Sequence, residues 1–341
     1  MLFEDILITL LKAVDGERTI SSPYHLLKGK KSGQTLQDIG YYKLHPYFGI
    51  LPKLEKDVYD RAVQGLFKKG LIVTDGEVVR MTEKASAVKL APTLLNGWKF
   101  RGNEQLFMAR LSLLVQTLSH IHQNSRVFDP VVIAEDTQQW VKNYLKKINY
   151  RDSASCKNIK EGIVQSLNAV EVDESNKMIV LQRLSGLKIG GLTWEQIARE
   201  ESRSIIDIQV QAVETLHGWM EVIEKGDFPL LRSLLDGVIQ HSALTETARR
   251  TEGYFKNGRT LEEIAALRGL KTSTIEDHFV ELAMNDPGFD ILGFMEASLY
   301  AKIIAVSRTQ NTKRLRDIKE NVPEASYFQI RLALATKGEI Q

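Results

Sequence analysis

Residues 259–279 read RTLEEIAALRGLKTSTIEDHF, and this stretch decides the fold of the tail. Thr260 and, three positions later, Glu263 have the form of a capping box at the start of a helix. Gly269 supplies the turn that ends this helix, and apolar residues at helical spacing on both sides of it would share one core. The pattern predicts a helix-turn-helix unit. Its predicted core residues are Leu261, Ile264, Ala265, Leu270, Ile275, Phe279 and Leu282.

The second helix of this unit is predicted to begin at Ser273, which has the form of another capping box with Glu276. Such a helix normally enters the major groove of DNA. Its expected exposed positions include Glu276, Asp277 and Glu281, whose carboxylates would oppose phosphate binding. We therefore favour protein docking over base reading for this helix. Three residues at its N-terminus are still predicted to contact the DNA backbone: Lys271, Thr272 and Ser273.

Residues 312–335, TKRLRDIKENVPEASYFQIRLALA, repeat the helix-turn-helix plan. Asn321 and Pro323 break the first helix, and Ser326 with Gln329 predicts a cap on the next. The unit is rich in cations, which favours contact with DNA phosphates or docking of an acidic peptide. A solvated face that binds nothing is the alternative. The basic residues predicted to bind DNA are Lys313, Arg314, Arg316, Lys319 and Arg331.

Near the N-terminus, residues 71–85 read LIVTDGEVVRMTEKA and predict a β-hairpin followed by a helix. Asp75-Gly76 between two β-rich runs is a strong hairpin signal, because the type I′ turn needs positive φ angles. An amphipathic helix at the start of the chain and a second helix ending before Gly70 are predicted to precede the hairpin. This order, together with the phrase MTEKA, resembles a winged-helix unit.

The remainder of the chain is predicted to be helical, so the expected fold class is all-α with one small hairpin. In the middle region, Thr193 with Gln196 predicts a capped helix, and Asp129-Pro130 predicts a helix start. Long helices are expected around 203–224 and 227–240. The predicted domains are a winged-helix-like unit at 1–91, a linker at 92–102, a helical middle at 103–240 and a helix-turn-helix domain at 241–341.

Composition limits the classes of function. The 341 residues include 45 Lys and Arg against 43 Asp and Glu, so any basic surface must be local. The single cysteine, Cys156, excludes an intrachain disulfide and a thiolate metal cage. The N-terminal apolar stretch lacks a basic n-region, and no apolar run approaches the ~18 residues that span a bilayer. We therefore expect a cytoplasmic protein that does not enter a membrane.

The segment 28–48 interleaves cations with aromatic residues. Bases of single-stranded DNA stack on aromatic rings while the backbone follows positive charge, and tyrosines are also common in protein interfaces. The alternative is that Tyr42, Tyr47 and Phe48 fill the winged-helix core. The residues predicted to bind single-stranded DNA or a protein are Lys28, Lys30, Lys31, Tyr41, Tyr42 and Lys43.

The motifs do not indicate an enzyme. Residues 29–32, Gly-Lys-Lys-Ser, resemble the end of a phosphate-binding loop, but Tyr24 stands where that loop requires glycine. His120 and His122 are two positions apart, so a helix would point them in different directions. We expect no catalytic site, no cofactor and no metal.

Two phrases of the tail, at 258–279 and 314–335, resemble the helix-turn-helix domain at the C-terminus of some bacterial RecQ-family helicases. The phrase at 25–51, HLLKGKKSGQTLQDIGYYKLHPYFGIL, resembles the YpbB-type proteins of low-GC Gram-positive bacteria, which carry this tail without a helicase motor.

The resemblance implies a nucleoid-associated accessory or recruitment factor for a RecQ-like helicase in DNA repair and recombination, with DNA as a partner. Whether it also contacts the acidic tail of a single-strand-binding protein stays open. The competing hypothesis is a transcriptional regulator that reads duplex DNA through its helix-turn-helix.

Overall fold

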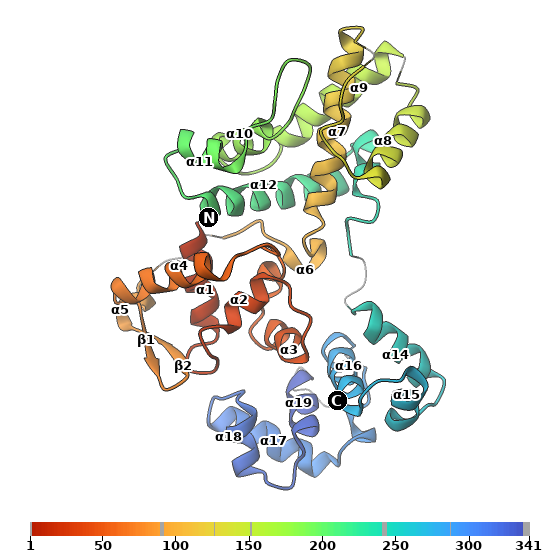
Figure 1. Cartoon of the computed structure of the whole chain (residues 1–341). Helices are drawn as coiled ribbons and strands as arrows, with labels where there is room; N and C mark the ends of the chain where they lie inside the picture. Colours follow the sequence, from red (N-terminus) through yellow and green to blue (C-terminus); the bar gives the residue numbers. More distant parts are fainter. Residues whose placement is uncertain are drawn as a thin grey trace. The chain divides into compact units, whose positions relative to one another are not determined.

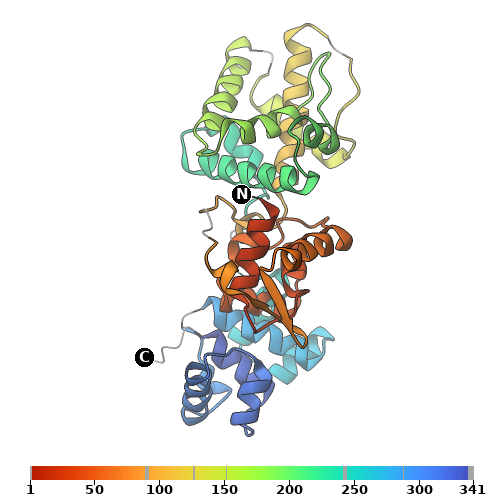
Figure 2. The same ribbon diagram turned by 90° about the vertical axis from the view of Figure 1, so that its left-hand side faces the viewer.

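The computed structural model describes residues 2–88, 92–125, 127–150, 152–240, 244–286 and 288–336. Within these residues the chain is mainly helical and carries one two-stranded antiparallel hairpin, as two perpendicular views show (Figure 1, Figure 2). The prediction of a mainly α fold with one small hairpin is therefore confirmed.

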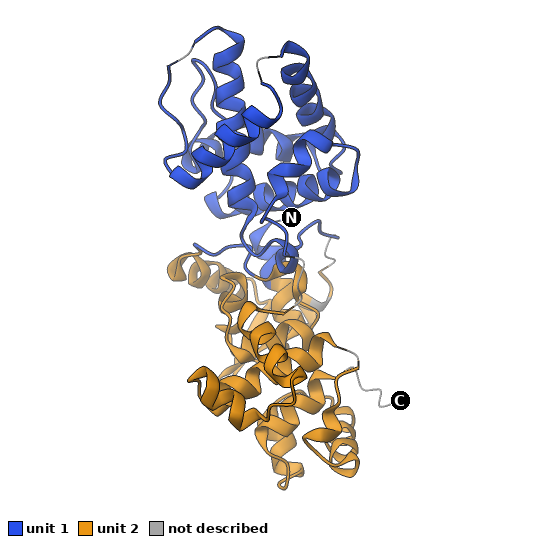
Figure 3. Cartoon of the chain, turned by 90° about the vertical axis from the view of Figure 1, so that its right-hand side faces the viewer, with its two compact units in different colours: residues 1–7, 49–53, 89–240 blue, residues 8–48, 54–88, 241–341 orange. Residues whose placement is uncertain are grey.

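The chain forms two compact units (Figure 3). Unit 1 contains residues 1–7, 49–53 and 89–240, and unit 2 contains residues 8–48, 54–88 and 241–341. The N-terminal segments and the helix-turn-helix tail, which the sequence assigned to separate domains, thus belong to one unit. They do so because the helix at 33–41 packs against two helices of the tail.

The N-terminal part of unit 2 follows the predicted order of helices and hairpin. The boundary between the two units falls within its first helix. Its elements are α1 (Phe3–Ala13), α2 (Ser22–Leu27), α3 (Gly33–Tyr41), the 3₁₀ turn η1 (His45–Tyr47), α4 (Lys56–Lys68), β1 (Ile72–Asp75), β2 (Val78–Met81) and α5 (Glu83–Ser86).

The hairpin forms where the sequence predicts it, with its turn one residue further along the chain. Asp75 pairs with Val78, so the two-residue loop is Gly76-Glu77 rather than Asp75-Gly76. Gly76 has φ +60°, a conformation that glycine adopts without steric cost. An isolated antiparallel bridge between Thr19 and Val78 extends the pairing beyond the two strands.

The tail contains both predicted helix-turn-helix units. Capping boxes form at Thr260 and Ser326, and Gly269 adopts φ +60° in the turn, as predicted. The box expected at Ser273 does not form, because the helix begins one residue earlier and Lys271 occupies the N-cap position. The elements of the tail are α14 (Glu246–Lys256), α15 (Leu261–Arg268), α16 (Thr272–Asn285), η3 (Ile291–Gly293), α17 (Ala297–Thr309), α18 (Leu315–Asn321) and α19 (Tyr327–Ala335).

The predicted core of the first helix-turn-helix unit is confirmed. Ile264, Ile275 and Phe279 are fully buried in one cluster, against which Leu261 and Leu270 pack from its edge. Residues on both sides of the turn therefore bury one shared apolar surface, which is the main stabilising contribution in such a unit.

Unit 1 holds the helices of the middle region. The capping box at Thr193 is present. The helix start expected at Asp129 is wrong, since α8 begins only at Glu135, and the long helix expected over 227–240 is replaced by two short turns. The elements are α6 (Gly97–Phe100), α7 (Glu104–His122), α8 (Glu135–Lys147), α9 (Ser153–Asn168), α10 (Glu174–Gln182), α11 (Trp194–Glu200), α12 (Ile205–Lys225), α13 (Pro229–Arg232) and η2 (Ser233–Leu235).

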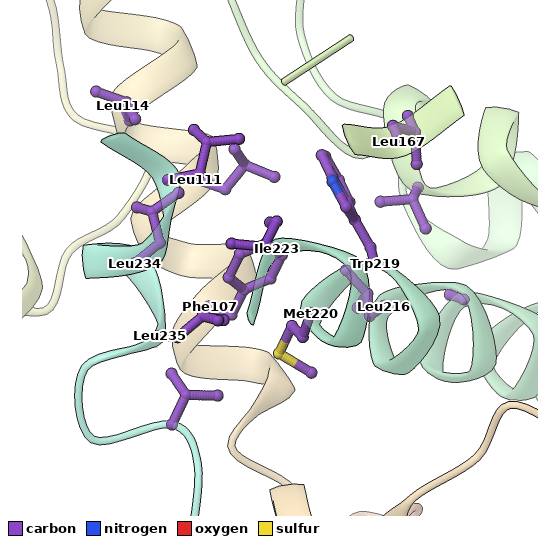
Figure 4. Close-up of a cluster of buried hydrophobic side chains, with 14 of the residues drawn as sticks. Phe107, Leu111, Leu114, Leu167, Leu216, Trp219, Met220, Ile223, Leu234 and Leu235 are labelled. Atoms are coloured by element: carbon purple, nitrogen blue, oxygen red, sulfur yellow. The ribbon is translucent and has the colours of Figure 1, made fainter. Parts of the chain in front are cut away.

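The core of unit 1 surrounds Trp219 of α12 (Figure 4). The indole is fully buried, and its Nε1 donates a hydrogen bond to Ser166 Oγ at 2.8 Å. Its ring meets Phe107 of α7 edge to face, with centroids 5.6 Å apart. A buried tryptophan needs a partner for its N–H, and Ser166 supplies it, so α7, α9 and α12 are held together by one side chain.

The segment 92–102, predicted to be a linker, is an ordered part of unit 1. It contains α6, and it is bonded to α12: Thr93 Oγ1 donates to Glu214 (2.7 Å), and the Asn96 N–H donates to His217 Nδ1 (2.9 Å). Because that nitrogen accepts, His217 Nε2 carries the proton and faces the buried Glu104 carboxylate at 3.4 Å.

A buried histidine lies inside the first helix-turn-helix unit. His278 of α16 is 5% exposed, and its Nδ1 lies 2.8 Å from Thr251 Oγ1 and 3.4 Å from Arg268 Nη1. A guanidinium only donates, so this nitrogen accepts, and a proton on it would face a positive charge. Burial, together with the charge of Arg268, lowers the pKa of His278 to about 4.

We expect the free energy of unfolding to fall as the pH drops from about 6.5 to about 4, because the unfolded chain protonates His278 and the folded chain does not. A pKa that folding depresses contributes stability above the unfolded value, and this is lost as the pH approaches the folded value. Urea denaturation at about pH 7 and about pH 4.5 should show a loss from this group on the order of 2 kcal/mol. In His278→Gln that part of the pH dependence should disappear; an unchanged dependence would contradict the assignment.

Candidate nucleic-acid interface

The second helix of the first helix-turn-helix unit is largely enclosed by its own chain. α16 packs against α14 and α15 of the unit, and also against α19 and α3 (Figure 1). Residues from His278 to Ala283 are all buried. A recognition helix normally presents one face along its length to a DNA groove. In this structure most of α16 has no such free face.

The first turn of α16 remains accessible. Lys271, Thr272 and Ser273, the residues predicted to contact the DNA backbone, are all exposed. They lie at the N-terminus of a 14-residue helix, where backbone N–H groups and the helix dipole favour an anion. The structure therefore places these three residues where a phosphate can reach them, and their contact with DNA stays a prediction.

The acidic residues of α16 are not arranged as the sequence suggested. Glu281, expected to be exposed, is 4% exposed and accepts a hydrogen bond from Thr245 Oγ1 at 2.9 Å. That expectation was wrong because α14 covers this side of α16. Asp277 forms an ion pair with Arg331. Both carboxylates thus bind other residues of the tail, although the Asp277 side chain stays 36% exposed.

Arg331 of α19 joins three helices. Its guanidinium pairs with Asp277 of α16, and it is only 15% exposed. The side-chain amide of Gln37 in α3, with its oxygen turned toward Arg331, accepts from Nη2 at 2.7 Å and from Nε at 2.8 Å. The Tyr41 hydroxyl donates to the Arg331 carbonyl oxygen at 2.9 Å. The predicted DNA contact Arg331 is thus engaged within unit 2.

Two glycines allow α3 to approach α16 closely. Gly33 and Gly40 are seven positions apart and therefore lie on the same face of the helix. A Cβ atom on Gly33 would overlap the Asp277 carboxylate, and one on Gly40 would overlap the terminal methyl of Met284. Larger residues at these positions would separate the two helices or displace both side chains.

Lys313 also contacts the N-terminal part of unit 2. Its ammonium group donates to the Tyr41 carbonyl oxygen and lies 4.8 Å from the centre of the Tyr42 ring. Its backbone N–H donates to the Glu17 carboxylate at 3.1 Å. Burial lowers the pKa of Lys313, and the neighbouring cations Arg18 and Lys43 act in the same direction. Lys313 is therefore held by the N-terminal segment.

A second cation, Arg18, also lies near the Tyr42 ring. Arg18 lies 5.4 Å from the ring centre, and its guanidinium pairs with the Asp38 carboxylate at 2.8 Å. Burial opposes the charge of Arg18, but the attraction of Asp38 outweighs it and raises the pKa of Arg18 above its usual value. Sequence reasoning missed Glu17, Arg18 and Asp38. The only local sign was a carboxylate at position 38 beside the apolar Ile39.

The other predicted cations of the tail differ in accessibility. The Lys319 ammonium donates to the carbonyl oxygens of Pro323 and Ala325, both at 2.7 Å, and so closes the turn between α18 and α19. Arg314 is 40% exposed and lies 3.7 Å from Asp317. Arg316 is 80% exposed and pairs with Glu320 one helical turn away. Arg314 and Arg316 are thus the members of this set that reach solvent.

The predicted N-terminal docking residues also differ in their exposure to solvent. Lys30, Lys31 and Lys43 are exposed, whereas Lys28 donates to the Leu54 carbonyl oxygen at 3.3 Å. Tyr41 and Tyr42 lie against the tail through Arg331 and Lys313. Tyr47 and Phe48 are buried in unit 2, at 7% and 2% exposure. The aromatic rings and the free lysines therefore do not alternate on one open surface.

Comparison with known proteins agrees with the geometry of the tail. A protein family described as a helix-turn-helix domain matches residues 247–334. The chain therefore carries a C-terminal helix-turn-helix domain, a class of domain that points to DNA as a binding partner. Over 343 aligned positions it is 30% identical to Protein YpbB of Bacillus subtilis (strain 168), covering 97% of this chain and 96% of that protein. The chain belongs to the YpbB family.

No solved structure matches this chain. Among the described residues, no helix has both the length and the apolar character that crossing a membrane requires. Within the same residues, no group of three or more His, Cys, Asp or Glu side chains is placed to hold a metal ion.

Replacing Arg331 by Ala should lower the free energy of unfolding by about 1–3 kcal/mol, because Asp277 and Gln37 would be left without a shared, largely buried partner. Arg316→Ala is the matched control, since it removes an arginine of the same tail that is 80% exposed, and it should change stability by less than about 0.5 kcal/mol. Urea denaturation followed by circular dichroism measures both. Equal effects of the two substitutions would contradict the internal role of Arg331.

Proposed function

We propose that this protein is a non-enzymatic accessory factor that recruits a RecQ-family helicase to DNA during repair and recombination. The observation that carries the proposal is the enclosure of α16 by α3 and α19. A helix-turn-helix domain whose recognition helix is covered is poorly suited to base reading, but its exposed cations can still neutralise phosphates. Such a protein would raise the local concentration of a bound helicase near DNA without chemistry of its own.

The non-enzymatic part of the proposal is supported by the surroundings of residues 29–32. A phosphate-binding loop connects a β-strand to a helix. Here the segment Gly29–Ser32 connects α2 to α3, and Ser32 caps α3 by accepting from the Thr35 N–H at 3.4 Å. The serine that resembled a nucleotide ligand thus has a role in helix capping, and the energy for DNA unwinding would come from the partner.

The helicase part is tested by co-purification. The tagged protein and the RecQ-type helicase of the same organism should remain associated at moderate salt after nuclease treatment, which removes association through bridging DNA. A motor-inactive helicase serves as a second bait, because recruitment does not require ATP hydrolysis. Failure to associate, with both proteins shown to be folded, would contradict the helicase role and leave DNA binding to be judged separately.

Replacing both Arg314 and Arg316 by Ala should weaken binding to duplex DNA and reduce the slope of log K against log salt by about 0.9 for each phosphate that is no longer neutralised. The matched control is Lys157→Ala in α9, because Lys157, like Arg316, is an exposed cation with a glutamate one turn away. Fluorescence anisotropy over a range of salt concentrations measures affinity and slope. An unchanged slope in the double variant would show that these arginines do not bind phosphates.

The same assay separates the proposal from a transcriptional regulator. Sequence-specific regulators bind their sites ~10³–10⁷ times more tightly than other DNA. We expect random duplex to compete as well as genomic fragments. A strong preference for a particular genomic fragment would instead favour operator reading, for which α16 would have to leave α3.

A further inference from the structure

Unit 1 contains a cavity whose lining comes from neither the tail nor the N-terminal segment. It has a volume of about 880 Å³ and lies between the second half of α7, α8 and the residues Asn124, Ser125, Phe128 and Pro130. Its floor is apolar and buried, formed by Leu113, Val141 and Leu145. Cavities of this size and character are typical of sites that receive a ligand or the anchoring side chains of a peptide.

The wall of the cavity is held by specific contacts. The Gln116 amide fixes the chain opposite α7, donating to the Asp129 carbonyl oxygen at 3.1 Å and accepting from the Val131 N–H at 2.9 Å. The Phe128 ring, part of the lining, stacks on His120 with centroids 4.4 Å apart. These contacts fix residues 128–131 over α7, and this part of the cavity wall is therefore well defined.

The mouth of the cavity is positively charged. Lys142 and Lys146 are four positions apart on α8, so they lie on one face of the helix, and both are exposed. The lining residues include no aspartate or glutamate. Within the described part of the chain, neither lysine has an ion-pair partner. The pair thus presents two charges that an incoming carboxylate could neutralise at the edge of an apolar site.

Apolar surface continues outside the cavity along the same segment. Val127 is 90% exposed, Val131 44% and Ile133 88%. Single exposed apolar residues are ordinary, but three within seven positions beside an apolar cavity enlarge the surface that a partner could cover. A ligand confined to the cavity would leave Val127 and Ile133 in water.

We propose that this cavity binds an acidic peptide segment of a partner protein, with a bulky apolar side chain on Leu113 and Leu145 and carboxylates at Lys142 and Lys146. A peptide combines negative charge with apolar side chains, and its neighbouring residues can cover Val127 and Ile133. A nucleic-acid strand offers phosphates but no aliphatic group for the floor. The site goes beyond the proposed DNA role, since none of its residues belongs to the tail.

The test is selection of a random peptide library, about 12 residues long, on the full-length protein, followed by anisotropy with the enriched peptides after fluorescein labelling. Acidic peptides with one or two bulky apolar residues should be enriched. Their affinity should fall at least about tenfold in Lys142→Glu/Lys146→Glu and should decrease with salt, as expected for charge pairing at an interface rim. Absence of such peptides from the enriched pool would overturn the proposal.

Two further variants separate the cavity from general charge effects. Lys157→Glu/Lys160→Glu reverses two exposed lysines of α9 outside the cavity and should leave binding unchanged. Thr117→Phe places a ring in the cavity and should abolish binding with both mouth lysines retained; if it does not fold, the charge-reversal pair alone decides. If the Lys142→Glu/Lys146→Glu variant binds the enriched peptides as tightly as the unchanged protein does, the proposed site is wrong. The proposal is also overturned if the protein binds no peptide but binds oleate or oligothymidylate, and if the Lys142→Glu/Lys146→Glu variant weakens that binding.

Discussion

The close contact between α3 and α16 is the constraint on which unit 2 depends. Gly33 and Gly40 lie on one face of α3, where an added Cβ atom would displace the Asp277 carboxylate or the terminal methyl of Met284. With the helices this close, the end of α3 reaches the Arg331 carbonyl oxygen and the Lys313 ammonium through Tyr41. The N-terminal helices with the hairpin and the helix-turn-helix tail thereby become one folded unit.

The cations that lie near the contact between α3 and the tail have partners within unit 2. Burying an arginine or lysine is costly unless a partner satisfies it, and each buried cation here has one: Arg18 pairs with Asp38, and Arg331 with Asp277. The Tyr42 ring lies within cation–π distance of both Arg18 and Lys313. Consequently the cations that remain accessible for DNA are fewer than the local sequence suggests, in keeping with a chain of net charge +2.

The two units offer different chemistry for recognition. Unit 2 presents exposed cations and the accessible N-terminus of α16, which suit phosphates. Unit 1 is organised around Trp219 and is extended by the ordered segment 92–102, which bonds to α12. Its cavity combines an apolar floor with two lysines, which suits carboxylates carried on an apolar chain. The recruiting role that we propose would use both kinds of surface.

The sequence by itself determined the local structure: the capping boxes at Thr260 and Ser326, the turn at Gly269 and the position of the hairpin. Each of these depends on residues only a few positions apart, so propensity and hydrogen-bonding rules suffice. The tertiary structure alone decided which charges are exposed. Tyr41 and Arg331 are separated by 290 positions and yet share a hydrogen bond. A helical pattern shows which side of a helix is polar, but not whether solvent, DNA or another part of the chain covers that side.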